Sequence, residues 1–362
     1  MPIRRILHSN LFLLLASILV TLLVLEAVLN WIGPTSLQVR RNENSFRSFV
    51  WNPENTRFDS ELGYMTRPNL DVPFENWEYK TRVRTNSWGF RDDEESLHDP
   101  KILLLGDSYC FGWGVEDDKT VDKFVERETG EKVLNMGAPG FGTIQQFLLL
   151  QRYCGTENAT GCTVVFLYYI NDRIENFIPP GGGVPTLRKE DRRLLFTPAS
   201  EEAYNAAMSV HETSFVTELS RMSAVADLVF GTLFNPRRGI VFASDFEWED
   251  WKVKEKQFPG VPVGPFEVLE NLLRVLKLYA LERDLQIRMV MLPFYTHFTD
   301  NDSSLDYSTE KKVFRMLDIP YRDLLDDFTR EDFYPHDRHL TPKGQEKLGV
   351  AIAKFLEDEK NP

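Results

Sequence analysis

Lys101-Ile-Leu-Leu-Leu-Gly-Asp-Ser-Tyr109 is the stretch of sequence that decides the fold. Its apolar run, Ile102 to Leu105, is typical of a short strand buried on both faces, as strands of parallel sheets are. The run ends at Gly-Asp-Ser, and open α/β sheets keep their active sites beyond the carboxyl ends of their strands. Ser108 is therefore a candidate nucleophile, although a strand followed by an ordinary polar turn explains this segment alone equally well.

The rest of the chain alternates between strand-like and helix-like patterns. Short apolar runs predict strands at 102–105, 132–135, 163–170 and 286–293. Helical patterns occupy 120–129, 143–153, 266–281 and 342–356. Strands that alternate with helices predict an α/β fold in which a parallel sheet carries helices on both faces.

The domain organisation follows from breaks in this alternation. Residues 34–100 are rich in aromatic side chains without a steady period, so we expect them to wrap onto a main domain at 101–362. More than a hundred residues separate the third strand from the fourth, too many for one loop. We expect an insertion at about 175–262, which would form a lid or cleft wall, or else a packing appendage or partner surface.

The N-terminus predicts a membrane helix. Residues 6–25 carry no formally charged side chain, and Arg4 and Arg5 precede them. A helix of this length spans the hydrocarbon core of a bilayer. A cleaved signal peptide is the alternative, but no Ala-x-Ala-like cleavage site follows the run. We expect residues 1–33 to form a single-pass signal-anchor in the cell membrane, with the catalytic domain extracytoplasmic, either periplasmic or extracellular.

Composition excludes some partners. The formal net charge of −13 argues against nucleic acid and against an anionic membrane surface, both of which attract basic proteins. Cys154 and Cys162 could form a disulfide in an oxidising compartment or remain free thiols. Cys110, two residues after Ser108, would be left over, and we interpret it as a small core thiol.

Four further residues follow predicted strands or lie in the last loop before the closing helix. Serine catalysis needs a base, a group that orients the base, and fixed donors for the oxyanion. His339 is the candidate base, and Asp337 is the candidate acid. Besides the Ser108 backbone, Gly140 offers an N–H and Asn171 a side-chain amide for the oxyanion.

This constellation resembles the SGNH, or GDSL-type, hydrolase superfamily in its membrane-anchored bacterial form. Gly106-Asp-Ser108 is similar to the first block of that family, Gly140 to the second, Asn171 to the third, and Asp337 with His339 to the last. The resemblance implies a three-layer α/β/α sandwich with a flavodoxin-like parallel sheet. It also implies hydrolysis of acyl esters by Ser108, with no cofactor and no metal ion.

The sequence departs from the family pattern at two positions. Tyr169 stands where a glycine often precedes the third-block asparagine, and His336 occupies the more usual position of the acid. We expect a serine esterase that acts on acyl groups, with O-acetyl groups on a glycan suggested by analogy alone. An O-acyltransferase that uses a polysaccharide hydroxyl, and a non-catalytic anchored binding module, are the alternatives.

Overall fold

The computed structural model describes residues 2–32, 49–76, 78–157, 159–176, 184–190, 193–209, 223–226, 265–298 and 306–360. These residues fall into two compact units. The first comprises Met1–Ser48 with His211–Ile240, and the second comprises Phe49–Val210 with Val241–Pro362. Most of the predicted insertion at 175–262 lies outside the described residues.

The first unit contains an apolar helix near the N-terminus, α1 (Pro2–Ile32). Its segment Leu11–Leu29 is long and apolar enough to cross a membrane, and it is not buried within the structure. These properties suit both a membrane anchor and a signal sequence. The short helix α9 (Ala224–Ala226) belongs to the same unit, and the Ser223 hydroxyl donates a 2.7 Å hydrogen bond to Glu26.

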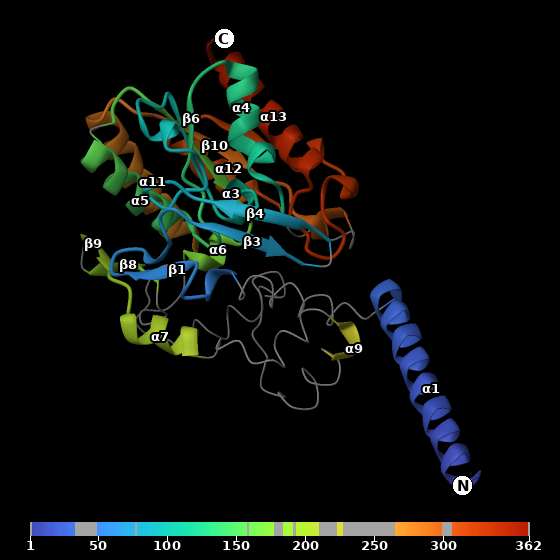
Figure 1. Ribbon diagram of the computed structural model, residues 1–362. Coiled ribbons are helices and arrows are strands. Elements are labelled where there is room, and N and C mark those ends of the chain that lie inside the picture. Colours follow the sequence, from blue (N-terminus) through green and yellow to red (C-terminus); the bar gives the residue numbers. More distant parts are fainter. Residues whose placement is uncertain are drawn as a thin grey trace. The chain divides into compact units, whose positions relative to one another are not determined.

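A five-stranded parallel sheet organises the second unit (Figure 1). Its strands are β5 (Ile102–Leu105), β6 (Val133–Asn135), β7 (Thr163–Tyr168), β10 (Gln286–Met291) and β11 (Tyr321–Asp323). Their spatial order is β11-β10-β7-β5-β6. Read from the β6 edge, with the strands numbered along the chain, this order is 2-1-3-4-5. That order defines a flavodoxin-like sheet, so the predicted fold class is confirmed.

Helices cover both faces of this sheet, as Figure 1 shows. Helices α4 and α13 pack together over one face, where they bury a cluster that includes Leu104, Val165, Val290 and Ile352. On the other face, Phe147 of α5 packs edge-on against Tyr279 of α11. The helices of this unit are α3 (Ser108–Phe111), α4 (Val121–Thr129), α5 (Thr143–Glu157), α6 (Asp172–Glu175), α7 (Glu201–Ser209), α11 (Pro265–Glu282), α12 (Ser308–Met316) and α13 (Pro342–Lys360).

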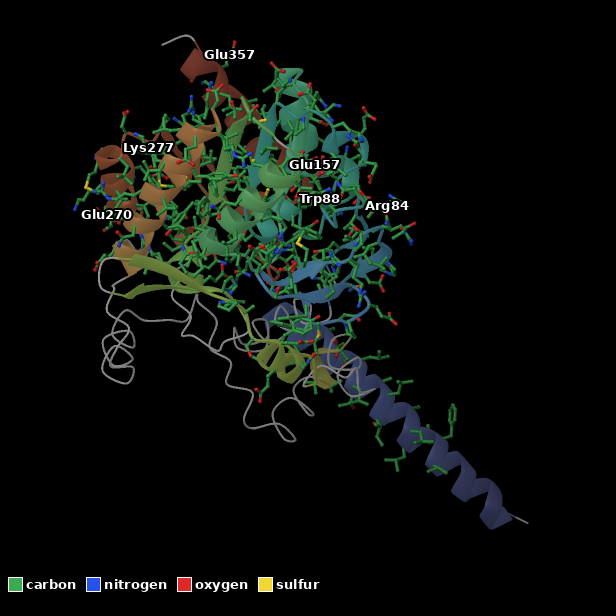
Figure 2. The ribbon with its side chains drawn as sticks, turned by 90° about the vertical axis from the view of Figure 1, so that its left-hand side faces the viewer. Arg84, Trp88, Glu157, Glu270, Lys277 and Glu357 are labelled. Atoms are coloured by element: carbon green, nitrogen blue, oxygen red, sulfur yellow. The ribbon has the colours of Figure 1, made fainter. Side chains whose placement is uncertain are left out.

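Antiparallel hairpins add to the sheet and helices of the second unit. They are β1 (Thr56–Asp59) with β2 (Gly63–Thr66), β3 (Asp71–Glu75) with β4 (Lys80–Arg84), and β8 (Thr186–Glu190) with β9 (Arg193–Thr197). The segment after β4 packs on the main domain: Trp88, labelled in Figure 2 with Glu157 of α5, lies edge-on to Tyr153 at 5.4 Å between ring centroids. Aromatic side chains of this segment thus pack against the α/β core.

The sequence patterns missed several elements. The predicted strands at 163–170 and 286–293 end two residues earlier in the structure, at Tyr168 and Met291. Strand β11, helix α12 and the three hairpins had not been predicted. All three cysteines are buried free thiols, so no disulfide joins Cys154 to Cys162.

Candidate active site

Ser108 stands at the sharp turn that joins β5 to α3. Gly106 permits this turn, because a Cβ at that position would lie only 2.7 Å from the Cys110 Cβ. The Asp107 carboxylate caps α3 by accepting a 2.9 Å hydrogen bond from the Tyr109 backbone N–H. The turn places Ser108 at the carboxyl edge of the sheet with 6% of its surface exposed.

The loop before α13 supplies His339 and Asp337. The Ser108 Oγ lies 2.7 Å from the His339 Nε2, and the His339 Nδ1 lies 2.6 Å from the Asp337 Oδ1. The Asp337 side chain is 1% exposed, whereas the imidazole is 21% exposed. The structure thus brings the three side chains into one hydrogen-bonded chain, an order that suits a nucleophile, a base and an orienting acid.

The backbone of this loop is anchored on both sides of the imidazole. Arg338 adopts a left-handed φ of 69°, which a non-glycine residue rarely takes without support. Its carbonyl accepts a 3.0 Å hydrogen bond from the Tyr109 hydroxyl, and the His339 carbonyl accepts one of 2.8 Å from the Tyr334 N–H. Asp337, rather than His336, is the residue in contact with the imidazole.

Aromatic rings enclose the imidazole. The ring centroids of Trp113 and Tyr109 lie 5.4 and 5.2 Å from that of His339. Tyr169 packs on Tyr109 at 4.5 Å between ring centroids. These rings restrict the rotation of the imidazole and form an apolar wall beside Ser108.

The tip of the β3–β4 hairpin contacts the loop that carries Asp337 and His339, a contact that the sequence analysis did not predict. The Asp337 Oδ2 accepts hydrogen bonds from the Asn76 amide at 3.0 Å and from the Tyr79 hydroxyl at 3.2 Å. The Glu78 carboxylate accepts bonds from the backbone N–H groups of His336 and Asp337 at 3.1 and 2.5 Å. No motif marks these contacts, because they join segments about 260 residues apart.

Asn171 lies beside the nucleophile turn, but its amide is already engaged. Its Nδ2 donates to Asp107 at 3.3 Å and to Glu175 at 2.9 Å. Its Oδ1 is buried without a hydrogen-bond partner among the described residues. The predicted proximity of Asn171 to the Gly-Asp-Ser turn is therefore observed, whereas a freely available amide is not.

Three buried acids surround this amide. Burial raises the pKa of Asp107, and burial together with the neighbouring acids raises the pKa values of Asp172 and Glu175 well above their usual range. Asp172 is tied into the fold by the Thr143 hydroxyl at 2.9 Å and the Tyr169 backbone N–H at 2.9 Å. Glu175 accepts a single hydrogen bond from the Asn171 amide, and its buried Oε2 has no hydrogen-bond partner among the described residues.

Gly140 lies in the loop after β6. Its φ of 76° is left-handed, which glycine adopts without strain. The loop is fixed by the Tyr64 hydroxyl, which donates a 2.6 Å hydrogen bond to the Pro139 carbonyl, and by the Ala138 N–H, which donates to the Gly106 carbonyl at 3.1 Å. The residue that contacts the nucleophile turn, Ala138, is thus only two positions before Gly140 in the chain.

Cys110 and metal ligands are the remaining candidates for chemistry. Cys110 is fully buried, and burial together with neighbouring carboxylates raises the pKa of its thiol well above the usual value, so its reactive thiolate is disfavoured. Within the described residues, no group of three or more His, Cys, Asp or Glu side chains is arranged to hold a metal ion.

Comparisons with known proteins give only distant similarity. No protein-family model and no curated protein matches the chain. Among solved structures, it is similar to a psychrotrophic esterase from Pseudoalteromonas (TM-score 0.37, 10% identity, 73% of this chain and 100% of that chain covered). It is also similar to an acetylxylan esterase from Geobacillus stearothermophilus (0.34, 12%, 73% and 95%) and a GDSL-like lipase from Bacteroides thetaiotaomicron (0.34, 10%, 71% and 88%).

Proposed function

We propose that the protein is a serine esterase that hydrolyses acyl esters through an acyl-enzyme. The single observation that carries this proposal is the continuous hydrogen-bonded chain from the Ser108 Oγ through His339 to the buried Asp337. These three hydrogen-bonded side chains lie at the carboxyl edge of a flavodoxin-like sheet, where such folds bind ligands.

In the proposed mechanism, the Ser108 Oγ attacks the ester carbonyl while its proton passes to the His339 Nε2, 2.7 Å away. The imidazolium then gives that proton to the departing alcohol, which leaves the acyl group on Ser108. Water enters, loses a proton to the same nitrogen and releases the carboxylic acid, which restores Ser108. Asp337 stabilises the imidazolium and holds the tautomer whose Nε2 is free to accept.

We assign the oxyanion to the backbone N–H groups of Ser108 and Gly140 and to the Asn171 amide. Neither N–H has a hydrogen-bond acceptor among the described residues, which supports the assignment. Of the two hydrogen bonds that the Asn171 amide donates, the one to Asp107 is the longer. We therefore assign the N–H of that bond to the oxyanion. Donors fixed in advance stabilise the developing negative charge more than water does.

The wider assignment is also a proposal. The order of the Gly-Asp-Ser, Gly140, Asn171 and Asp-x-His segments supports membership of the SGNH hydrolases, and the apolar α1 supports a membrane-anchored, extracytoplasmic enzyme. O-acetyl groups on glycans are the substrate class that the family resemblance suggests. Membrane fractionation, with protease added to intact cells and to spheroplasts, tests the location: recovery of a soluble chain that begins after residue 30 would contradict the anchor.

The activity is tested on the full chain in detergent with a fluorophosphonate probe and a p-nitrophenyl acetate assay. We expect the wild type to be labelled and to release p-nitrophenol, and Ser108→Ala to do neither. Cys110→Ser is the matched control, two residues away and buried, and it should keep labelling and turnover. Labelling that survives Ser108→Ala but is lost in Cys110→Ser would replace the serine mechanism with a thiol mechanism. Product analysis with an added sugar acceptor separates hydrolysis from acyl transfer.

A further inference from the structure

The tip of the β3–β4 hairpin forms hydrogen bonds with the Oδ2 atom and the backbone N–H of Asp337. The Asp337 Oδ1 faces the imidazole, and the Oδ2 accepts from Asn76 and Tyr79. The Asp337 backbone N–H donates to Glu78. Asn76, Glu78 and Tyr79 precede strand β5 in the chain and are not part of the α/β sandwich. The catalytic acid is therefore held by a hairpin outside that sandwich.

We propose that this hairpin tip is a positioning device for the catalytic acid, with Asn76 and Tyr79 fixing the carboxylate and Glu78 fixing the backbone that carries it. The proposal rests on the proposed serine hydrolase function for its effect on turnover. It concerns residues that act through Asp337 and His339 and do not touch substrate.

The two donors to Oδ2 control how Asp337 faces the imidazole. A carboxylate with one free oxygen can rotate and offer either oxygen to a partner. Hydrogen bonds from Asn76 and Tyr79 occupy Oδ2, so only Oδ1 remains for the His339 Nδ1–H. The same bonds stabilise the ionised carboxylate and thereby reduce the pull of Asp337 on the imidazole proton, since a carboxylate that accepts several bonds is a weaker base.

Glu78 controls the backbone of the loop. One carboxylate accepts from two successive N–H groups, those of His336 and Asp337, immediately before Arg338 with its left-handed φ. Such an unfavourable backbone conformation persists only where its surroundings enforce it. The two bonds to Glu78 provide that enforcement from the hairpin side, opposite the Tyr109 contact with the Arg338 carbonyl.

The hairpin tip is itself rigid enough for this task. The Asn76 Oδ1 accepts hydrogen bonds from the backbone N–H groups of Glu78 and Tyr79, at 2.7 and 3.1 Å. This side-chain-to-backbone turn leaves the Asn76 Nδ2 free to reach Asp337. The Tyr79 ring is buried between Phe74 and Tyr334, at 5.3 Å from each ring centroid. The three side chains that meet the loop are therefore fixed in advance.

The test uses the full chain in detergent with Asn76→Ala, Tyr79→Phe and Glu78→Gln. Glu75→Gln is the matched control, because it removes a carboxylate charge from an exposed side chain of the same hairpin, one that pairs with Lys80 at 3.8 Å. Each of the three variants should lower kcat for p-nitrophenyl acetate by roughly tenfold, the scale of one hydrogen bond to a charged group, with little change in KM. The control should match the wild type.

The pH profile separates positioning from a general loss of structure. Loss of a donor to Oδ2 makes Asp337 a stronger partner for the imidazolium, so Asn76→Ala and Tyr79→Phe should move the acid limb of kcat/KM to higher pH. A merely destabilised enzyme would lose activity with the limb unmoved.

A second readout does not depend on ester turnover. The proton shared by the His339 Nδ1 and Asp337 should give a downfield 1H resonance, which should shift or broaden in the three variants and stay in Glu75→Gln. Unchanged resonance, kcat and acid limb in Tyr79→Phe and Asn76→Ala would overturn the proposal. If the wild type has no esterase activity, the proposed function fails, and the resonance alone still decides the role of the hairpin.

Discussion

The Ser108 Oγ and the His339 Nε2 lie 2.7 Å apart, although 231 residues separate them in the chain. The sheet accounts for this contact. Ser108 follows the interior strand β5, and His339 lies in the loop that enters α13, a helix that packs with α4 over one face of the sheet. Parallel strands place their carboxyl ends at one edge, so residues that follow different strands converge there.

Asp337 and His336 compete for the role of the acid, and the contact with the imidazole favours Asp337. We expect Asp337→Asn to lower kcat by about 10⁴-fold, because an amide favours the wrong tautomer of His339 while the geometry is kept. His336→Ala is the comparison and should have a much smaller effect. Steady-state kinetics of both variants check this, and the reverse ranking would transfer the acid role to the other residue.

The prediction from sequence succeeded where local pattern and topology act together. The apolar runs located β5, β6, β7 and β10, and the rule for strand ends gathered Ser108, Asn171 and His339 at one edge. Strand β11 was missed because Tyr321–Asp323 is short, polar and only partly buried. The contacts of Asn76, Glu78 and Tyr79 were missed because they depend on where a separate hairpin docks, which no periodicity encodes.

Asn171 and Glu175 allow a paired test of the third oxyanion donor. We expect Asn171→Ala to lower kcat by roughly 10²–10³-fold, the scale for the loss of one such donor, without unfolding the protein. Burial and the neighbouring acids raise the pKa of Glu175 well above its usual range, so we expect Glu175→Gln, which places a neutral group of the same shape there, to leave kcat within about threefold. The kcat values of the two variants check this. A large loss in Glu175→Gln would mean that an ionised Glu175 is needed to hold Asn171.

Arg91 and Arg84 both pair with Asp117, but their surroundings differ. Arg91 is buried, and its guanidinium also donates to the carbonyls of Gly112 and Val115, in the turn that leads from the nucleophile helix. We expect Arg91→Met to lower the free energy of unfolding by about 3–5 kcal/mol, because it leaves the Val115 carbonyl without a donor and takes one of two donors from the Gly112 carbonyl, which also accepts from the Val115 N–H.

Arg84→Met is the matched control for this change. Arg84 makes its ion pair with Asp117 from an exposed position, labelled in Figure 2, so its loss should cost less than about 1 kcal/mol. Chemical denaturation of both variants measures the difference. Equal destabilisation would mean that the shared contact with Asp117, and not the buried carbonyls, determines the contribution of Arg91.

Glu78 gives the protein a dependence of stability on pH. Burial raises the pKa of Glu78 from 4.5 to about 7, although the hydrogen bonds that Glu78 accepts from two backbone N–H groups act to lower this pKa. Between these values the folded protein keeps a proton on Glu78 that the unfolded chain has released. The contribution of this group to the free energy of unfolding therefore falls as the pH rises from about 4.5 to about 7.

Glu78→Gln removes this titration and leaves the groups that face it, which are Asp337, His339 and Tyr334. We expect the free energy of unfolding of the wild type, minus that of the variant, to fall as the pH is raised from about 5 to about 7 and to level off above about 8. Urea denaturation followed by tryptophan fluorescence at each pH provides the measurement. Glu75→Gln, exposed on the same hairpin, should show no such slope. A wild-type-minus-Glu78→Gln difference that stays constant or rises with pH would contradict a raised pKa for Glu78.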